Sequence, residues 1–329
     1  MGTKSKIRWG IIGCGDVTEV KSGPPYQHTD GFELVAVMRR DAAKAEDYAK
    51  RHGVPKFYSD ADKLINDDEV DAVYIATPPD SHAAYALKVA AAGKPCCIEK
   101  PMAPSYAESL EIQQAFEKKD LPLFVAYYRR TLPRFLKIKE WLDTKEIGEV
   151  RHIRWFLAKP PNEMDKSGEY NWRTDAKVAP GGYFDDLASH GLDLFAYYLG
   201  DFQEVYGISK NQQGFYSAKD AITAAWSHKN GVSGEAAWNF GCDEHLDLVE
   251  IFGSEGKISF SLFDEHQICL KNAKGEQKLF IEHPKHVQQF HVESLRDDLL
   301  GNTTHPSTGK SALHTSWVMD KILGLTDST

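Results

Sequence analysis

The first third of the chain alternates short apolar runs with stretches whose apolar residues recur at helical spacing. Near-continuous apolar runs predict strands that are buried on both faces, and the stretches between them predict helices that cover a parallel sheet. The predicted strands are Ile7–Ile12, Phe32–Met38, Val70–Ala76, Pro95–Ile98 and Leu123–Ala126. The predicted helices are Ala42–His52, Ser59–Asn66, Ser81–Ala92 and Tyr106–Lys119. This order of elements predicts a doubly wound α/β domain.

The pattern changes near residue 150, where strand candidates begin to follow one another directly. Several of them alternate apolar and polar residues, which is typical of an antiparallel sheet with one face in the core. The candidates are Val150–Ala158, Phe202–Lys210, Ala221–His228, Ser233–Phe240, Leu246–Gly253, Lys257–Leu262, Gln267–Lys271 and Gln277–Glu282. Helices are expected at Tyr183–Leu199, Gln288–Leu300 and Gly309–Leu323. We therefore expect two domains, residues 1–126 and residues 127–329.

The composition fits a globular protein of that size. Of 329 residues, 42% are hydrophobic and 26% are charged. A formal net charge of −9 and the lack of a Lys/Arg run argue against nucleic acid as a partner. The five cysteines form no CxxC pair, no secretory signal core precedes the first strand, and no apolar run reaches membrane-spanning length. We expect a cytoplasmic protein with reduced thiols and no membrane contact.

A glycine-rich loop, Gly13–Thr18, follows the first predicted strand. In a dinucleotide fingerprint the first glycine, here Gly13, makes the turn, and the second, Gly15, lets the backbone approach pyrophosphate. The third glycine position holds Thr18, and Pro24-Pro25 should truncate the helix that follows, although a short helix still presents amides to a phosphate. The other loop residues expected at the cofactor are Asp16 and Val17. The loop indicates dinucleotide binding.

The end of the second strand bears on the choice between NAD and NADP. NAD enzymes usually place an acidic residue there against the ribose hydroxyls, whereas this chain has Arg39 and Arg40. A guanidinium can bind a 2′-phosphate through two parallel hydrogen bonds. The alternative is that both arginines are solvated and Asp41 binds the ribose of NAD. The residues favour NADP, with NAD possible.

An ordered set of motifs makes the chain recognisable over nearly its whole length. The motifs are Gly13-x-Gly15, Thr77-Pro78-Pro79 with His82, Glu99-Lys100-Pro101, Arg129-Arg130, Trp172-Arg173 and Gly181-Gly182 with Asp186 and His190. With them the chain resembles the glucose–fructose oxidoreductase / inositol dehydrogenase family (Gfo/Idh/MocA). The resemblance implies a Rossmann domain and a second α/β domain with a large, mostly antiparallel sheet. It also implies hydride transfer between a nicotinamide and a substrate carbinol, often in a sugar or polyol.

Lys100 is the first catalytic candidate. It follows an apolar strand at the carboxyl edge of the parallel sheet, where such folds place ligands. Its ammonium can hydrogen-bond the substrate oxygen and stabilise negative charge there. Without the motif a surface lysine would be the simpler interpretation. The resemblance also implies that Glu99 fixes the nicotinamide half of the cofactor, while Pro101 could be cis or trans. Further cofactor contacts are expected at Thr77, Pro78 and His82, with a role at the helix start as the alternative for His82.

Asp186 and His190 are the second catalytic pair. They are four residues apart on a predicted helix and therefore project from one face. An aspartate can fix the tautomer of an imidazole and support it as a base that takes the hydroxyl proton. The alternative is a pair that only caps the helix or is solvated. Asp185 and Asp193 also flank His190, and the family pattern selects Asp186.

Three further residues are expected at the substrate. Trp172 and Arg173 precede the helix of the catalytic pair and are expected to line the substrate wall. Tyr128, or its neighbour Tyr127, can reach the substrate from the end of the sixth strand, with core packing as the alternative. No metal is expected, because no cysteine or carboxylate pattern completes a ligand set around the remaining histidines. Those histidines are His283, His286, His291 and His305.

Two other functions remain open at this point, together with the assembly. A non-catalytic dinucleotide-binding regulator would not need Lys100 or the Asp186/His190 pair, so their presence favours an enzyme. A dihydrodiol dehydrogenase or a reductase of non-sugar carbonyls is the rival among enzymes. Few predicted helices cover the second sheet, and Ala221–Ala225 and Glu235–Trp238 leave apolar side chains to bury. We therefore expect a homodimer or homotetramer formed sheet to sheet.

Overall fold

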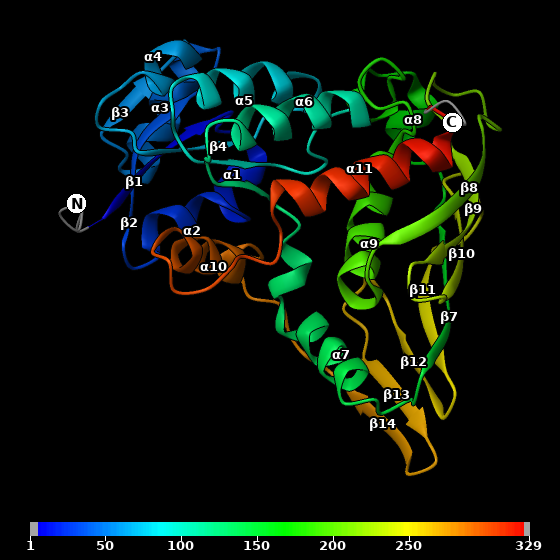
Figure 1. Ribbon diagram of the computed structural model, residues 1–329. Helices are drawn as coiled ribbons and strands as arrows, with labels where there is room; N and C mark the ends of the chain where they lie inside the picture. The colour runs from blue at the N-terminus through cyan, green and yellow to red at the C-terminus, as the bar shows by residue number, and fades with distance from the viewer. Residues whose placement is uncertain (1–5, 326–329) are drawn as a thin grey trace. The chain divides into compact units, whose positions relative to one another are not determined.

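The computed structural model describes residues 6–325, which form two compact units (Figure 1). Unit 1 contains the chain up to Ala103, Ala107–Thr131 and Pro284–Leu313. Unit 2 contains Pro104–Tyr106, Leu132–His283 and the chain from His314 onward. Each unit is built around its own sheet.

Unit 1 is the expected doubly wound domain. Its six strands are all parallel and lie in the order β3-β2-β1-β4-β5-β6. The strands are β1 (Ile7–Ile12), β2 (Phe32–Met38), β3 (Lys56–Tyr58), β4 (Ala72–Ile75), β5 (Cys96–Ile98) and β6 (Leu123–Val125). The chain order reverses at β1 and β4, which is where open α/β sheets bind ligands at the carboxyl ends of their strands. The edge strand β3 was not predicted, because it has only three residues and none of them is fully buried.

Two sets of helices cover the two faces of this sheet. One face packs against α4 (Ala61–Ile65), α5 (His82–Ala91) and α6 (Tyr106–Glu117). The other packs against α2 (Gly23–His28), α3 (Ala42–His52) and α10 (Gln289–Leu299). The prolines act as expected: α1 (Asp16–Val20) ends after five residues, and α2 starts afresh with proline in its first turn, where no intrahelical donor is needed.

The segment Pro284–Leu313 belongs to unit 1, which differs from the predicted division after residue 126. Thr308 forms a β-bridge with Phe124, and the Ser307 hydroxyl donates a hydrogen bond to the Val125 carbonyl at 2.7 Å. Helical periodicity identifies α10, but it carries no information about which sheet the helix covers. The sequence analysis placed this segment with residues 127–329, whereas its contacts group it with unit 1.

Unit 2 contains an eight-stranded sheet in the order β14-β13-β12-β11-β7-β10-β9-β8. Its pairings are antiparallel except for β7 with β10, so the sheet is mostly antiparallel as expected. The strands are β7 (Val150–Ala158), β8 (Phe202–Lys210), β9 (Ala221–His228), β10 (Ser233–Asn239), β11 (Leu246–Gly253), β12 (Gly256–Phe260), β13 (Ile268–Asn272) and β14 (Gly275–Leu279).

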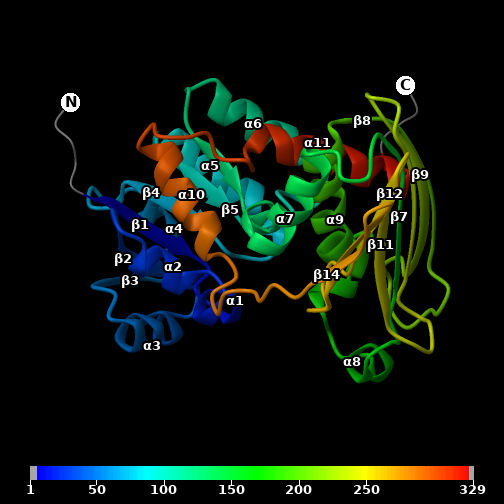
Figure 2. The same cartoon turned by 90° about the horizontal axis from the view of Figure 1, so that it is seen from below.

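Unit 2 also contains the helices α7 (Pro133–Asp143), α8 (Glu163–Ser167) and α9 (Tyr183–Leu199), and the part of α11 (Gly309–Leu323) that begins at His314. Helix α7 was not predicted, although Phe135, Ile138 and Trp141 give it a buried face at helical spacing. Helix α9 lies against one face of the sheet, whereas the other face is bare of helices within the described residues (Figure 2). Trp155 of β7 meets Phe195 of α9 in an edge-to-face contact.

Candidate active site

The glycine loop joins the end of β1 to the start of α1. Gly13 has a φ of +92°, and a Cβ atom there would lie 2.7 Å from Cγ2 of Thr77, so the turn requires glycine. At Gly15 a Cβ atom would enter open space, with its nearest neighbour 3.9 Å away. A side chain would fill that space, and glycine leaves it for a phosphate to approach the backbone. The loop therefore fits the pyrophosphate of a dinucleotide.

Thr18, at the third glycine position, bonds through its side chain to the backbone at the start of α1. Its Oγ1 accepts a hydrogen bond from the Gly15 N–H at 3.0 Å and donates one to the Gly15 carbonyl at 2.8 Å. The Tyr48 hydroxyl of α3 donates to the Thr18 carbonyl at 2.9 Å. Asp16 and Val17 begin α1 and lie between Gly15 and Thr18.

Arg39 lies beside the glycine loop. It follows β2, and its Nη1 is 3.4 Å from the Cys14 carbonyl oxygen. Arg40 is exposed to solvent. Asp41 caps α3, where its Oδ1 accepts the Lys44 N–H at 3.2 Å. The acidic residue is thus used at a helix start, and the guanidinium is the group next to the loop.

His82 connects two loops at the carboxyl edge of the sheet. It is fully buried, with Nε2 2.8 Å from the Thr77 carbonyl and Nδ1 3.1 Å from the Pro101 carbonyl. Burial lowers the pKa of His82. Pro78 lies between, at the start of the short 3₁₀ helix Pro79–Ser81. These contacts favour His82 as a brace between the Thr77 segment and the turn after Lys100.

The carboxylate of Glu99 holds the turn that carries Lys100. Oε2 of Glu99 accepts the backbone N–H of Lys100 at 3.1 Å. Oε1 accepts the Tyr74 hydroxyl at 2.5 Å and Nε2 of Gln288 at 2.7 Å. The Lys100–Pro101 peptide bond is cis, and Lys100 is half-buried. Because β1, β4 and β5 are parallel neighbours, this turn, the Thr77 segment and the glycine loop all lie at one edge of the sheet.

In unit 2, Asp186 and His190 lie one helical turn apart on α9, the helix that the sequence predicted. Oδ2 of Asp186 accepts a hydrogen bond from Nε of Arg173 at 2.9 Å. The Arg173 guanidinium in turn lies over the Trp172 ring, 4.4 Å from its centroid. The predicted wall residues and the predicted catalytic aspartate therefore form one connected cluster. The sequence did not predict this ion pair.

The side chain of His190 is 5% exposed. Its ring makes a T-shaped contact with the Phe263 ring, with centroids 6.1 Å apart. The next residue, Gly191, faces the Trp155 ring, and a Cβ atom there would collide with it. Glycine thus lets α9 pack closely on the sheet, which fixes the depth at which His190 lies.

The other two carboxylates near His190 have structural partners. Asp185 accepts the Gly181 N–H at 2.9 Å, and burial raises the pKa of Asp185 to about 7. Asp193 accepts the Thr315 hydroxyl at 3.3 Å. The partners distinguish Asp186 as the carboxylate joined to the Arg173 cluster.

The two tyrosines after β6 differ in environment. Tyr127 is buried in the core of unit 1, whereas Tyr128 is partly exposed. The Arg129 guanidinium lies over the Tyr128 ring, 5.2 Å from its centroid, and its Nη1 is 3.2 Å from the hydroxyl. Of the pair, Tyr128 is the one whose side chain is partly open to solvent.

Two site residues were missed from the sequence, Tyr74 and Gln288. A tyrosine in an otherwise apolar buried strand is a weak signal, since its hydroxyl needs a partner. Gln288 gives no local signal, because it is 189 residues from Glu99.

Within residues 6–325 no group of three or more His, Cys, Asp or Glu is placed to hold a metal ion. No helix in that range is long and apolar enough to span a membrane.

The chain matches known proteins over most of its length. A family model described as an oxidoreductase family with an NAD-binding Rossmann fold matches residues 7–127, and the GFO/IDH/MocA C-terminal domain matches residues 135–259. Oxidoreductase P35 of Formosa agariphila is 40% identical over 98% of this chain and 99% of its own. The 1,5-anhydro-D-fructose reductase of Ensifer adhaerens is 24% identical over 93% and 92%.

Among solved structures, a levoglucosan dehydrogenase in complex with NADH and levoglucosan superposes with a TM-score of 0.83 at 20% identity, covering 97% of this chain and 96% of that one. This likeness extends over both sheets. Together the two matched models and the full-length relative show that the chain belongs to the Gfo/Idh/MocA family of oxidoreductases.

Proposed function

We propose that this protein is an NAD(P)-dependent dehydrogenase that transfers a hydride between C4 of a bound nicotinamide and a carbinol or carbonyl carbon of a sugar, polyol or related small substrate. The observation that carries the proposal is Lys100 held by Glu99 at the same sheet edge as the glycine loop. A cytoplasmic location is part of the proposal, which the five free cysteines favour.

Each predicted catalytic residue has a defined task in this proposal. During oxidation His190 accepts the proton of the substrate hydroxyl, and Lys100 donates a hydrogen bond to the same oxygen. Asp186, one helical turn before His190, is proposed to orient the imidazole, and its own carboxylate is held by Arg173. Trp172, with the Arg173 guanidinium over its ring, offers a flat surface to the C–H face of a sugar. Tyr128 is a further proposed substrate contact.

A sugar or polyol is supported by the relatives named above, one of which reduces 1,5-anhydro-D-fructose and another of which was solved with levoglucosan. The test is a fluorescence screen of cofactor consumption and formation against aldoses, osones, inositols and dihydrodiols. Turnover of one of the first three classes supports the proposal. Turnover of dihydrodiols alone would replace it with the dihydrodiol dehydrogenase alternative.

We also propose NADP as the preferred cofactor, because Arg39 lies beside the glycine loop and Asp41 is engaged as a helix cap. Arg39→Asp is expected to weaken NADPH binding by about 10- to 100-fold, on the order of one or two charge-assisted hydrogen bonds. Titration by nicotinamide fluorescence measures it, with Lys50→Asp on the exposed face of α3 as the charge-matched control. If the unchanged protein binds NADH as tightly as NADPH, the preference is wrong.

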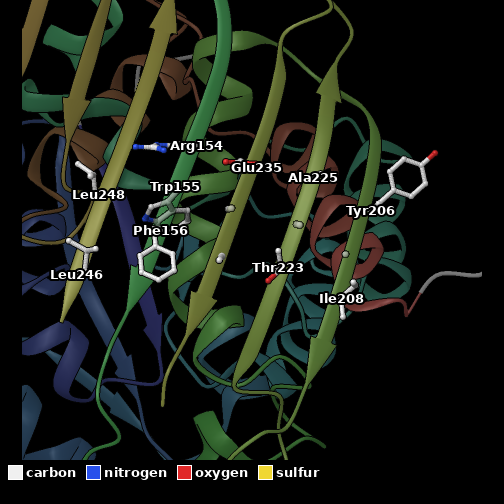
Figure 3. A pocket seen from close by; sticks show the side chains of 14 residues that line it. Arg154, Trp155, Phe156, Tyr206, Ile208, Thr223, Ala225, Glu235, Leu246 and Leu248 are labelled. Atoms are coloured by element: carbon white, nitrogen blue, oxygen red, sulfur yellow. The ribbon is translucent and has the colours of Figure 1, made fainter. Parts of the chain in front are cut away.

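The helix-free face of the unit 2 sheet supports self-association (Figure 3). Tyr206 and Ile208 of β8 are each 69% exposed on this face, and Phe156 of β7 and Leu246 of β11 are also exposed there, across β9 and β10 from them. These side chains border a groove of about 700 Å³. Trp238, which we expected to need a partner, is instead buried in the core of unit 2. We propose that the face pairs with the same face of a second copy, giving a homodimer or homotetramer.

Ile208→Lys is therefore expected to shift the protein from oligomer to monomer, because the ammonium would be desolvated in the interface. Sedimentation velocity at micromolar concentration measures the shift. Leu136→Lys, at a partly exposed apolar position on α7, is the control and should leave assembly unchanged. An unchanged protein that sediments only as the 36.9 kDa monomer would rule the interface out.

A further inference from the structure

The residue before Lys100 carries a buried carboxylate that accepts three hydrogen bonds. Glu99 is 8% exposed, and its oxygens accept the Tyr74 hydroxyl, Nε2 of Gln288 and the backbone N–H of Lys100. A carboxylate taken out of water must be compensated by hydrogen bonds, so each donor here is costly to remove.

The arrangement of the donors fixes the rotation of the carboxylate. Tyr74 and Gln288 come from different elements and both donate to Oε1, at 2.5 Å and 2.7 Å. With Oε1 held between them, Oε2 is left facing the Lys100 N–H. The backbone of Lys100 is thus oriented through the side chain of its neighbour.

Gln288 also reaches the helix that follows the glycine loop. Its backbone N–H donates to the Lys21 carbonyl at the end of α1 at 3.3 Å. Two residues earlier, Nδ1 of His286 lies 2.5 Å from the Val20 carbonyl. Gln288 is 1% exposed and lies outside both residue ranges matched by the family models. One residue therefore connects the end of the phosphate-binding helix with the Lys100 turn.

We propose that Gln288 is a positioning residue for the reaction, which acts on Lys100 through the carboxylate of Glu99. The inference rests on the proposed function, in which Lys100 bonds to the substrate oxygen. Displacement of a catalytic group by about 1 Å can cost on the order of a hundredfold in rate. Loss of the Gln288 donor frees the carboxylate to rotate and so loosens the Lys100 turn.

Gln288→Met keeps the side-chain length and removes the donor. It is expected to lower kcat by about 10- to 100-fold while KM and the NADPH dissociation constant change by less than about threefold. The substrate is the compound that the screen selects. Gln289→Met is the matched control, because the Gln289 side chain donates to Glu293 within α10 rather than to Glu99, and it should behave like the unchanged protein.

A second measurement needs no substrate. In the NADPH-bound protein, hydrogen exchange of a peptide covering residues 96–103 is expected to be faster in Gln288→Met than in Gln289→Met. Tyr74→Phe should also speed hydrogen exchange of this peptide. Its control is Tyr58→Phe, because the Tyr58 hydroxyl, on the edge strand β3, donates to Asp67 and not to Glu99. Because Tyr74 and Gln288 share one oxygen, the double variant should lose less activity than the product of the two single losses.

The outcomes separate the two proposals. If Lys100→Met keeps full activity, the proposed function fails, and exchange at the 96–103 peptide still decides whether Gln288 orders the turn. If Lys100→Met is inactive and Gln288→Met keeps its kcat, only the positioning role fails. The role is also wrong if Gln288→Met lowers the melting temperature and the fraction of molecules that bind NADPH, but leaves kcat per NADPH-binding molecule unchanged. If Gln288→Met does not fold, the comparison of Tyr74→Phe with Tyr58→Phe decides whether the donors to Glu99 order the Lys100 turn.

Discussion

Replacing His190 with alanine is expected to lower kcat for alcohol oxidation by about a hundred- to ten-thousand-fold, the range for loss of a general acid–base. Cofactor affinity should change little, because His190 is proposed to act on the substrate hydroxyl. Steady-state kinetics and fluorescence titration of the cofactor measure the two effects. His245→Ala is the control, since His245 is exposed in unit 2 and contacts only Asp264 among its recorded partners.

The pH profile sharpens this prediction. A base that takes a proton works only when it is unprotonated, so the oxidation rate should rise with pH and the rise should vanish in His190→Ala. Asp186→Asn should show an intermediate loss, because the imidazole remains while its orientation is less constrained. A His190→Ala protein that keeps the same rise in rate with pH would contradict the assignment of the base.

Replacing Lys100 with methionine is expected to lower kcat by on the order of a hundred- to a thousandfold, as removal of one hydrogen-bond donor to a charged oxygen does in other enzymes. The change keeps the length of the side chain and deletes its charge, so the loss should fall on kcat more than on cofactor binding. Lys94→Met is a matched control, because Lys94 precedes β5 at the opposite edge of the sheet. Circular dichroism must show that each variant is folded. If folded Lys100→Met and His190→Ala both turn over at near wild-type rates, the site assignment is wrong.

The fold was predictable for most elements whose apolar pattern was long and regular, with α7 as an exception. Most strands of both sheets and the helix that carries Asp186 and His190 follow from periodicity. The three-residue strand β3 is too short and too exposed to give such a pattern. The return of Pro284–Leu313 to unit 1 depends on pairing with Phe124 and Val125, which no local pattern encodes. Local periodicity thus gives elements, and not the partners of elements far apart in the chain.

The candidate site divides in the same way. The glycine loop, Lys100 and the Asp186/His190 spacing are local motifs, and the sequence displays them directly. The contacts that orient them are not local. Arg173 bonds to Asp186 across 13 residues, and Gln288 bonds to Glu99 across 189. Side-chain reach and burial decide such pairs, so they become visible only once the chain is folded.

The most direct test of the central claim is transfer of deuterium from the cofactor to a substrate carbon. The protein is incubated with NADPH or NADH that carries deuterium at one face of C4, together with the carbonyl form of each compound class in the screen. Deuterium from one face only is expected on a single carbinol carbon of a sugar or polyol product, as seen by mass spectrometry and NMR. The transfer is expected to be lost in Lys100→Met. Tight binding of the deuterated cofactor, with no deuterium in any product, would contradict the account and indicate a dinucleotide-binding regulator instead.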